Sequence, residues 1–174
     1  MTDNNQVKAL ISFENINEKT LKRLGFCLGQ LLCAGDVILL RGEMGAGKSV
    51  LTRAAAAGLG VEGPVPSPTF TILNIHEGTQ LRLYHFDLYR LESADALWEM
   101  GLEEYIPSAD GATFIEWPQM AEEAMPQDVL EIEIVYAQEG MARSVFMTTM
   151  GDFDAARLDG LKEKMEACCE YSDD

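Results

Sequence analysis

Residues 42–49 match the phosphate-binding loop pattern G-x-x-x-x-G-K-[ST] at every fixed position. The loop lies between an apolar run at 36–40, typical of a buried strand, and a helix-forming run at 50–57 that ends at Gly58. This order aims backbone N–H groups and the positive end of a helix at an anion. We expect Lys48 to reach the β- and γ-phosphates and the Ser49 hydroxyl to bind Mg²⁺. The residues predicted to contact the nucleotide are Glu43, Met44, Gly45, Ala46, Gly47, Lys48, Ser49 and Val50.

The alternative interpretation of the octet is a glycine-rich surface turn. Because glycine makes up about 7% of residues in an average protein, the pattern arises by chance in about one chain per hundred or fewer at this length. The flanking strand and helix patterns make a chance match rarer still, so nucleotide binding is favoured.

Two other apolar runs end in a carboxylate and are candidates to complete the site. Residues 83–86 lead to Asp87, and residues 114–115 lead to Glu116. In an open α/β sheet the carboxyl ends of the strands face the ligand crevice. Either carboxylate is suited to bind Mg²⁺, and the other to polarise an attacking water. The alternative for each is a surface acid at a strand end, in a chain with 29 acidic residues.

Hydroxyl groups lie at the end of the Gly- and Pro-rich loop at 58–68 and directly after it. Ser67 and Thr69 are candidates to sense a γ-phosphate, as segments in this position act as switches. An ordinary proline-stiffened turn is the alternative. His85 is interpreted as a packed strand residue, and Trp117 as either a cover for the site or a core or surface residue.

The composition bounds the class of protein. A chain of 174 residues with 47% hydrophobic residues is typical of one domain with a real core. The net charge of −16 disfavours autonomous nucleic-acid binding, because it repels phosphate backbones. No apolar run is long enough for a membrane span, and the polar start lacks a secretory signal, so a cytoplasmic location is expected. Cys27 and Cys33 are interpreted as core residues, and the cysteine spacing does not indicate zinc.

The remaining patterns predict the elements that position these residues. Helices are expected at 18–34, 93–100 and 152–169; strands at 69–75, 81–86, 111–117, 129–136 and 143–150, with turns at 77–79 and 138–140. The mixture predicts an α/β fold, a three-layer P-loop NTPase architecture with a mostly parallel central sheet and antiparallel edge strands. Residues 1–150 are expected to form the P-loop ATPase domain, and residues 151–174 a C-terminal helix and acidic tail packed on or extending from it.

Two sequence patterns that are missing from the chain restrict the class of reaction. No N-K-x-D sequence occurs, so guanine-specific recognition is unsupported. Between Arg53 and Arg143 the basic residues are Arg82 and Arg90 alone, which argues against a small-molecule kinase with an arginine-rich lid. Hydrolysis of an adenine nucleotide is therefore favoured over phosphoryl transfer to a metabolite.

Four motifs in this order resemble the TsaE family (also called YjeE), bacterial P-loop proteins of threonylcarbamoyladenosine tRNA modification. They are the loop at 42–49, Ser67-Pro68-Thr69-Phe70, His85-Phe86-Asp87-Leu88-Tyr89-Arg90 and Ile115-Glu116-Trp117-Pro118, and residues 97–105 also look like the family. The resemblance spans roughly residues 12–150. It implies an ATPase, weak alone and stimulated by partners, that uses ATP and Mg²⁺ and acts with TsaB and TsaD. The complex modifies position 37 of tRNA, so this chain would meet tRNA indirectly.

The resemblance also implies roles for single residues. Ser49 and Glu116 resemble the Mg²⁺ ligands, and Asp87 the acid that orients water or the metal. Lys48 and Thr69 join Asp87 as expected catalytic residues, and Thr20 resembles a residue that borders the adenine. Ser49 stands where the family usually has Thr and keeps the hydroxyl, whereas Val50 replaces a second Thr. Two alternatives stay open: a stand-alone phosphotransferase, and a binding module that holds ATP without hydrolysing it.

Overall fold

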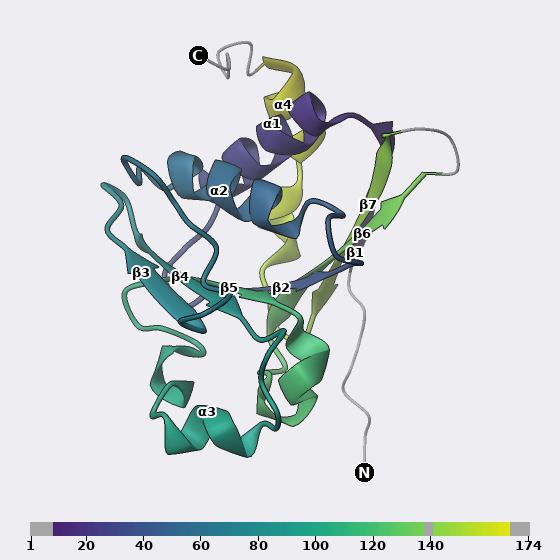
Figure 1. The fold of residues 1–174 in the computed structure, drawn as a ribbon. Helices are drawn as coiled ribbons and strands as arrows, with labels where there is room; N and C mark the ends of the chain where they lie inside the picture. The colour runs from purple at the N-terminus through teal and green to yellow at the C-terminus, as the bar shows by residue number, and fades with distance from the viewer. Residues whose placement is uncertain (1–8, 138–140, 168–174) are drawn as a thin grey trace.

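The computed structural model describes residues 9–137 and 141–167, which form one mixed sheet with helices on both faces (Figure 1). Along the chain the strands and α-helices are β1 (Ala9–Ile16), α1 (Glu18–Gly29), β2 (Val37–Arg41), α2 (Lys48–Gly58), β3 (Leu73–His76), β4 (Arg82–Asp87), α3 (Asp95–Glu99), β5 (Gly111–Glu116), β6 (Val129–Tyr136), β7 (Arg143–Met150) and α4 (Leu161–Ala167). Short 3₁₀ helices are η1 (Glu103–Tyr105), η2 (Pro118–Ala124) and η3 (Ala155–Leu158).

The strand order is β1-β7-β6-β2-β5-β4-β3. The four central strands, β6, β2, β5 and β4, are parallel, and β3, β7 and β1 pair antiparallel at the two sides. Every residue of β5 is buried, as in a parallel strand that is covered on both faces. The predicted fold class, with its parallel centre and antiparallel edges, is confirmed.

Helices α1, α2 and α4 cover one face of the sheet, and α3 lies on the other (Figure 1). The larger hydrophobic cluster joins α1 and α2 to the sheet, with Leu21, Leu28 and Leu51 fully buried. A second cluster on the α3 side includes Phe86, Leu97 and Ile115. These two apolar layers hold the carboxyl ends of the central strands in fixed register.

Helix α1 is shorter than predicted because the chain turns before β2. Asn17 caps its start by accepting the Thr20 N–H at 2.8 Å. After Gly29 the Asp36 carboxylate accepts the Cys33 N–H at 2.7 Å and holds the turn. Cys27 is buried as expected, whereas Cys33 lies in this turn and is exposed, so its assignment to the core was wrong.

Three other element predictions need correction. Strand β1 was not predicted at all. The strand expected from residue 69 begins at Leu73, because the Pro68 carbonyl accepts the N–H groups of Thr71 and Ile72 and closes a turn. The C-terminal helix is split into η3 and α4, with Gly160 at a φ of +78° between them. The turn expected at 138–140 and the acidic tail lie outside the described residues.

The segment after β7 packs on the same core as α1. Phe153, Leu158, Leu161 and Met165 belong to the larger hydrophobic cluster. Arg157 donates to both oxygens of Asp36, at 2.7 and 2.8 Å. Within residues 9–137 and 141–167, no helix has the length and apolar character that a membrane crossing requires.

Candidate functional site

The loop between β2 and α2 leaves the carboxyl end of the parallel centre, where the sequence predicts a phosphate site. Gly42, Gly45 and Gly47 have φ values of +147°, +80° and +121°, which side chains other than glycine rarely adopt. A Cβ atom on Gly47 would lie 2.6 Å from Leu21 Cδ2. Helix α2 begins without a side-chain cap, so the N–H groups of its first turn remain for an anion.

Lys48 lies across this loop. Its Nζ donates to the carbonyl oxygens of Gly42 at 2.7 Å and Glu43 at 2.9 Å, and lies 4.2 Å from the centroid of the Trp117 ring. Burial lowers the pKa of Lys48, while the charges of Glu116 and Asp87 act to raise it. An anion bound beside Nζ would further favour the charged form.

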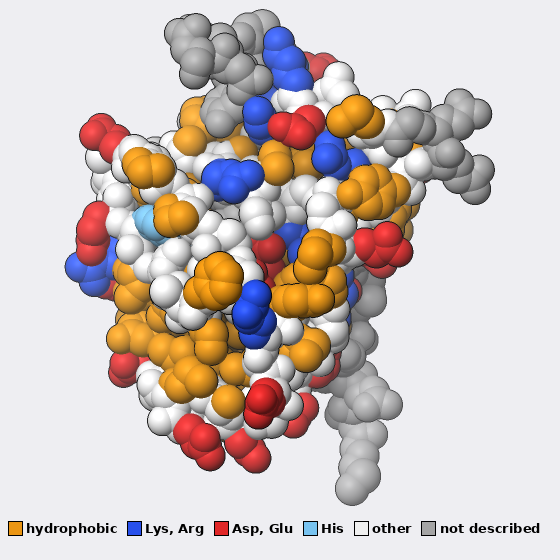
Figure 2. Space-filling view, viewed as in Figure 1, with side chains coloured by type: hydrophobic (Ala, Val, Ile, Leu, Met, Phe, Trp, Pro, Cys, Tyr) orange, Lys and Arg blue, Asp and Glu red, His pale blue; other side chains and the backbone are white. Residues whose placement is uncertain are grey.

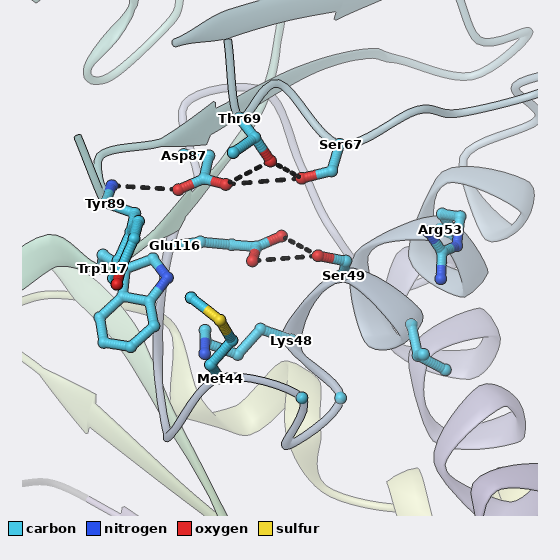
Figure 3. A pocket seen from close by; sticks show the side chains of 13 residues that line it. Met44, Lys48, Ser49, Arg53, Ser67, Thr69, Asp87, Tyr89, Glu116 and Trp117 are labelled. Atoms are coloured by element: carbon cyan, nitrogen blue, oxygen red, sulfur yellow. Dashed lines mark hydrogen bonds between the residues drawn. The ribbon is translucent and has the colours of Figure 1, made fainter.

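Ser49 and Glu116 are in direct contact. The Ser49 Oγ donates to Glu116 Oε1 at 2.9 Å and Oε2 at 3.1 Å (Figure 3). Two neighbouring ligands of an octahedral Mg²⁺ with bonds of about 2.0–2.1 Å are separated by about 2.9 Å. The spacing and the oxygen chemistry of this pair therefore fit Mg²⁺, and Ser49 and Glu116 remain the predicted ligands.

Asp87 lies beside Glu116 because the two residues pair in the register of β4 and β5. Its Oδ2 accepts from the hydroxyls of Thr69 at 3.2 Å and Ser67 at 3.5 Å, and its Oδ1 accepts the Tyr89 N–H at 3.0 Å (Figure 3). The loop expected to act as a switch is thus tied directly to one of the two candidate carboxylates.

A single pocket of about 380 Å³ gathers most of the predicted residues. Its lining joins the phosphate loop, the start of α2 and the ends of β4 and β5 (Figure 3). The lining residues are Met44, Gly45, Gly47, Lys48, Ser49, Val50, Arg53, Ser67, Thr69, Asp87, Tyr89, Glu116 and Trp117.

Three predicted contact residues lie elsewhere. Ala46 is fully buried in the core. Glu43 borders a neighbouring pocket that shares Met44 and Trp117 with the first. Thr20 lines a separate pocket of about 330 Å³ between β1, α1 and α4, and is not among the residues around the phosphate loop.

Arg143 on β7 is a candidate that the sequence matched only loosely to a Gly/Arg turn of the family and did not assign to the site. It is buried, its Nε has no hydrogen-bond partner in the described part of the chain, and that atom lies 3.4 Å from the Cβ position of Gly47. It borders a cleft of about 560 Å³ with Asn15, Asn17 and Lys19. The available signal was an arginine at the start of a strand pattern, but the strand register was needed to aim it at the loop.

The strand, glycine loop, helix and strand-end carboxylates define a protein of the P-loop fold, which implies nucleotide binding. YdiB of Bacillus subtilis, a solved structure, superposes with a TM-score of 0.73 at 31% identity, over 93% of this chain and 97% of that one. Residues 16–145 match the family model "Threonylcarbamoyl adenosine biosynthesis protein TsaE".

The chain belongs to the TsaE family, which acts in tRNA threonylcarbamoyladenosine biosynthesis. It is 35% identical to the TsaE protein of Bacillus subtilis over 142 residues, 82% of this chain and 87% of that one. It is 38% identical to the TsaE protein of Nostoc over 146 residues, 80% of this chain and 88% of that one. The predicted family is therefore confirmed.

Proposed function

We propose that this chain binds ATP with Mg²⁺, hydrolyses it, and serves as the ATPase subunit of the tRNA threonylcarbamoyladenosine machinery together with TsaB and TsaD. One observation carries the proposal: Lys48, Ser49, Asp87 and Glu116 line the same pocket at the end of the phosphate loop. A loop that only held a nucleotide would not require two buried carboxylates on adjacent strands.

The phosphates of ATP bind along Gly45, Gly47 and the first turn of α2, where the N–H groups are available. Lys48 turns from the Gly42 and Glu43 carbonyls to the β- and γ-phosphates. The nucleoside leaves the loop on the side of Gly47 that faces Arg143, toward the cleft formed with Asn17. In this arrangement the unpartnered Nε of Arg143 gains an acceptor.

Ser49 and Glu116 hold Mg²⁺, which neutralises charge on the phosphates when it is bound. Asp87, at the end of the adjacent strand β4, and Thr69, in the loop before β3, hold the attacking water, since their side chains already contact each other at 3.2 Å. Asp87 accepts a hydrogen bond from that water and orients its lone pair toward the γ-phosphorus. The phosphate loop and Lys48 stabilise the charge that shifts to the β-phosphate.

A protein partner is supported by the rim of the pocket. Met44, which lines the pocket, is 64% exposed, and Phe70, next to the lining residue Thr69, is 84% exposed. Figure 2 shows hydrophobic side chains gathered across this face, with acidic ones mostly toward its edges. Phe70 follows Thr69 directly, so a partner bound there would be next to the residues that contact Asp87. The net charge of −16 favours contact with tRNA through the partners.

We further propose a cytoplasmic location, where tRNA is modified. We also assign residues 1–150 to the ATPase domain and residues 151–174 to a C-terminal extension of that same domain. The extension's described part shares the core of α1 through Phe153 and Leu161.

The test measures ATP hydrolysis by this chain alone and with TsaB–TsaD. Stimulation by the partners is the expected result. Absence of stimulation together with phosphorylation of a metabolite would favour the stand-alone phosphotransferase, and tight binding with no turnover would favour the binding module. Glu116→Gln should reduce Mg²⁺-dependent turnover more than metal-free nucleotide binding, whereas Glu99→Gln, on the exposed side of α3, is the matched control.

A further inference from the structure

His85 lies behind the proposed magnesium ligand and has no role in the mechanism above. It is on β4, two residues before Asp87, and its side chain is fully buried. Its Nε2 is 2.8 Å from Glu116 Oε1. The Glu116 carboxylate is therefore contacted by the Ser49 hydroxyl at both of its oxygens and by the imidazole at Oε1.

The contacts of the imidazole indicate which nitrogen carries the proton. A carboxylate that binds Mg²⁺ only accepts hydrogen bonds, so in the proposed site Nε2 is the donor toward Glu116. The other nitrogen, Nδ1, is buried without a hydrogen-bond partner among the described residues. An unpaired buried N–H is costly, so the neutral Nε2–H tautomer accounts for both observations.

We propose that His85 is a positioning residue: through its bond to Oε1 it holds the Glu116 carboxylate in the orientation in which both oxygens face Ser49 and can serve Mg²⁺. This inference rests on the proposed function and adds a residue to its metal site. Without the Nε2–H bond the Glu116 carboxylate can rotate about its last side-chain bond, and each rotation moves its oxygens relative to Ser49. Hydrogen bonds of this kind to a ligating group commonly contribute 10- to 100-fold in metal affinity.

If His85 had a purely structural role, replacing its side chain would give a different result. If the imidazole only fills space between β4 and β5, an apolar side chain of similar volume replaces it without changing the metal site. If its donor is what matters, an amide that donates from the same place restores the metal site, although its shape differs. Leucine and glutamine at residue 85 therefore separate the two roles.

The experiment measures binding of a fluorescent, non-hydrolysable ATP analogue to the full chain, in EDTA and across a Mg²⁺ titration. For His85→Leu we expect the Mg²⁺ concentration at half-saturation to rise about 10- to 100-fold. The affinity in EDTA should stay within about twofold, because no phosphate contact is lost. His85→Gln should recover most of the wild-type Mg²⁺ dependence. His76→Leu, the same change on neighbouring strand β3, should leave both measurements unchanged.

The inference is overturned by an unchanged Mg²⁺ dependence in His85→Leu, by an equal loss of affinity in EDTA, or by a glutamine variant as impaired as the leucine one. If His85→Leu does not fold by circular dichroism, His85→Met replaces it. If His85→Leu and His85→Met both fail to fold while His85→Gln folds, the imidazole is needed for folding, and this result also overturns the inference. If the wild type itself showed no Mg²⁺ dependence, the proposed function would fail and the inference with it.

Discussion

Replacing Gly47 by alanine tests whether the phosphate loop depends on the close contact between its backbone and α1. The φ of Gly47 is +121°, so an alanine there is strained whatever space surrounds it. The added methyl would lie 2.6 Å from Leu21 Cδ2, and Leu21 is fully buried and cannot easily move. Gly47→Ala therefore combines backbone strain with overpacking.

Backbone strain of this kind costs about 1–2 kcal/mol, and overpacking of a core contact about 1–3 kcal/mol. We expect the free energy of unfolding to fall by about 3 kcal/mol and the Tm by about 6–12 °C in a chain of this size. Relief of the contact forces the loop away from α1, so nucleotide affinity should fall at least about tenfold.

Thermal unfolding followed by circular dichroism, with nucleotide titration, measures both effects. Gly35→Ala is the matched control, since Gly35 also has a positive φ (+91°) but nothing within 4 Å of its Cβ position. Gly35→Ala should lower the free energy of unfolding by only about 1–2 kcal/mol and should bind nucleotide as the wild type does. Leu21→Ala combined with Gly47→Ala should show a coupling energy of about 1–3 kcal/mol. The reasoning would be refuted if Gly47→Ala and Gly35→Ala lowered the free energy of unfolding equally. It would also be refuted if the effects of Gly47→Ala and Leu21→Ala on that free energy were additive.

Three other substitutions test the chemistry. Asp87→Asn should bind an ATP analogue as the wild type does but lower kcat at least about 100-fold, and a raised KM with normal kcat would assign Asp87 to binding instead. Burial lowers the pKa of Lys48 and bound phosphate raises it, so nucleotide affinity should be full at neutral pH and fall as Lys48 loses its proton in the alkaline range. Lys48→Arg keeps its charge there and should flatten this fall, and the same pH profile in the wild type and the variant would contradict the reasoning. Phe70→Ser should leave basal turnover unchanged and weaken TsaB–TsaD binding about 30-fold in a pull-down titration, whereas unchanged binding would exclude this rim as a contact.

The parts of the site that follow from local sequence could be predicted. The glycine spacing at 42–49 determines the loop by itself, because its positive φ values demand glycine at particular positions. Asp87 and Glu116 could be placed at strand ends because each follows a buried apolar run, and the parallel pairing of β4 and β5 then brings them together.

The parts of the fold and the site that depend on pairing between distant residues could not be predicted from the sequence. Strand β1 finds its partner in β7, where Ala9 pairs with Thr149, and nothing near residue 9 indicates that pairing. Arg143 is aimed at the phosphate loop only through the register of β7 with its neighbours. The contact of His85 with Glu116 was missed for the same reason, since it crosses from one strand to the next. Thr20 was carried over by resemblance, and the structure places it in another pocket.

The strand order also decides when this protein can acquire its site during synthesis. Strand β2, which leads into the phosphate loop, pairs with β5 and β6, whose residues 111–136 are made long after it. The loop therefore leaves the ribosome with its strand unpaired, and a nucleotide has no complete pocket to bind until most of the chain is available. Since contacts between distant residues form slowly, ATP would stabilise the finished domain and would contribute little to guiding the early chain.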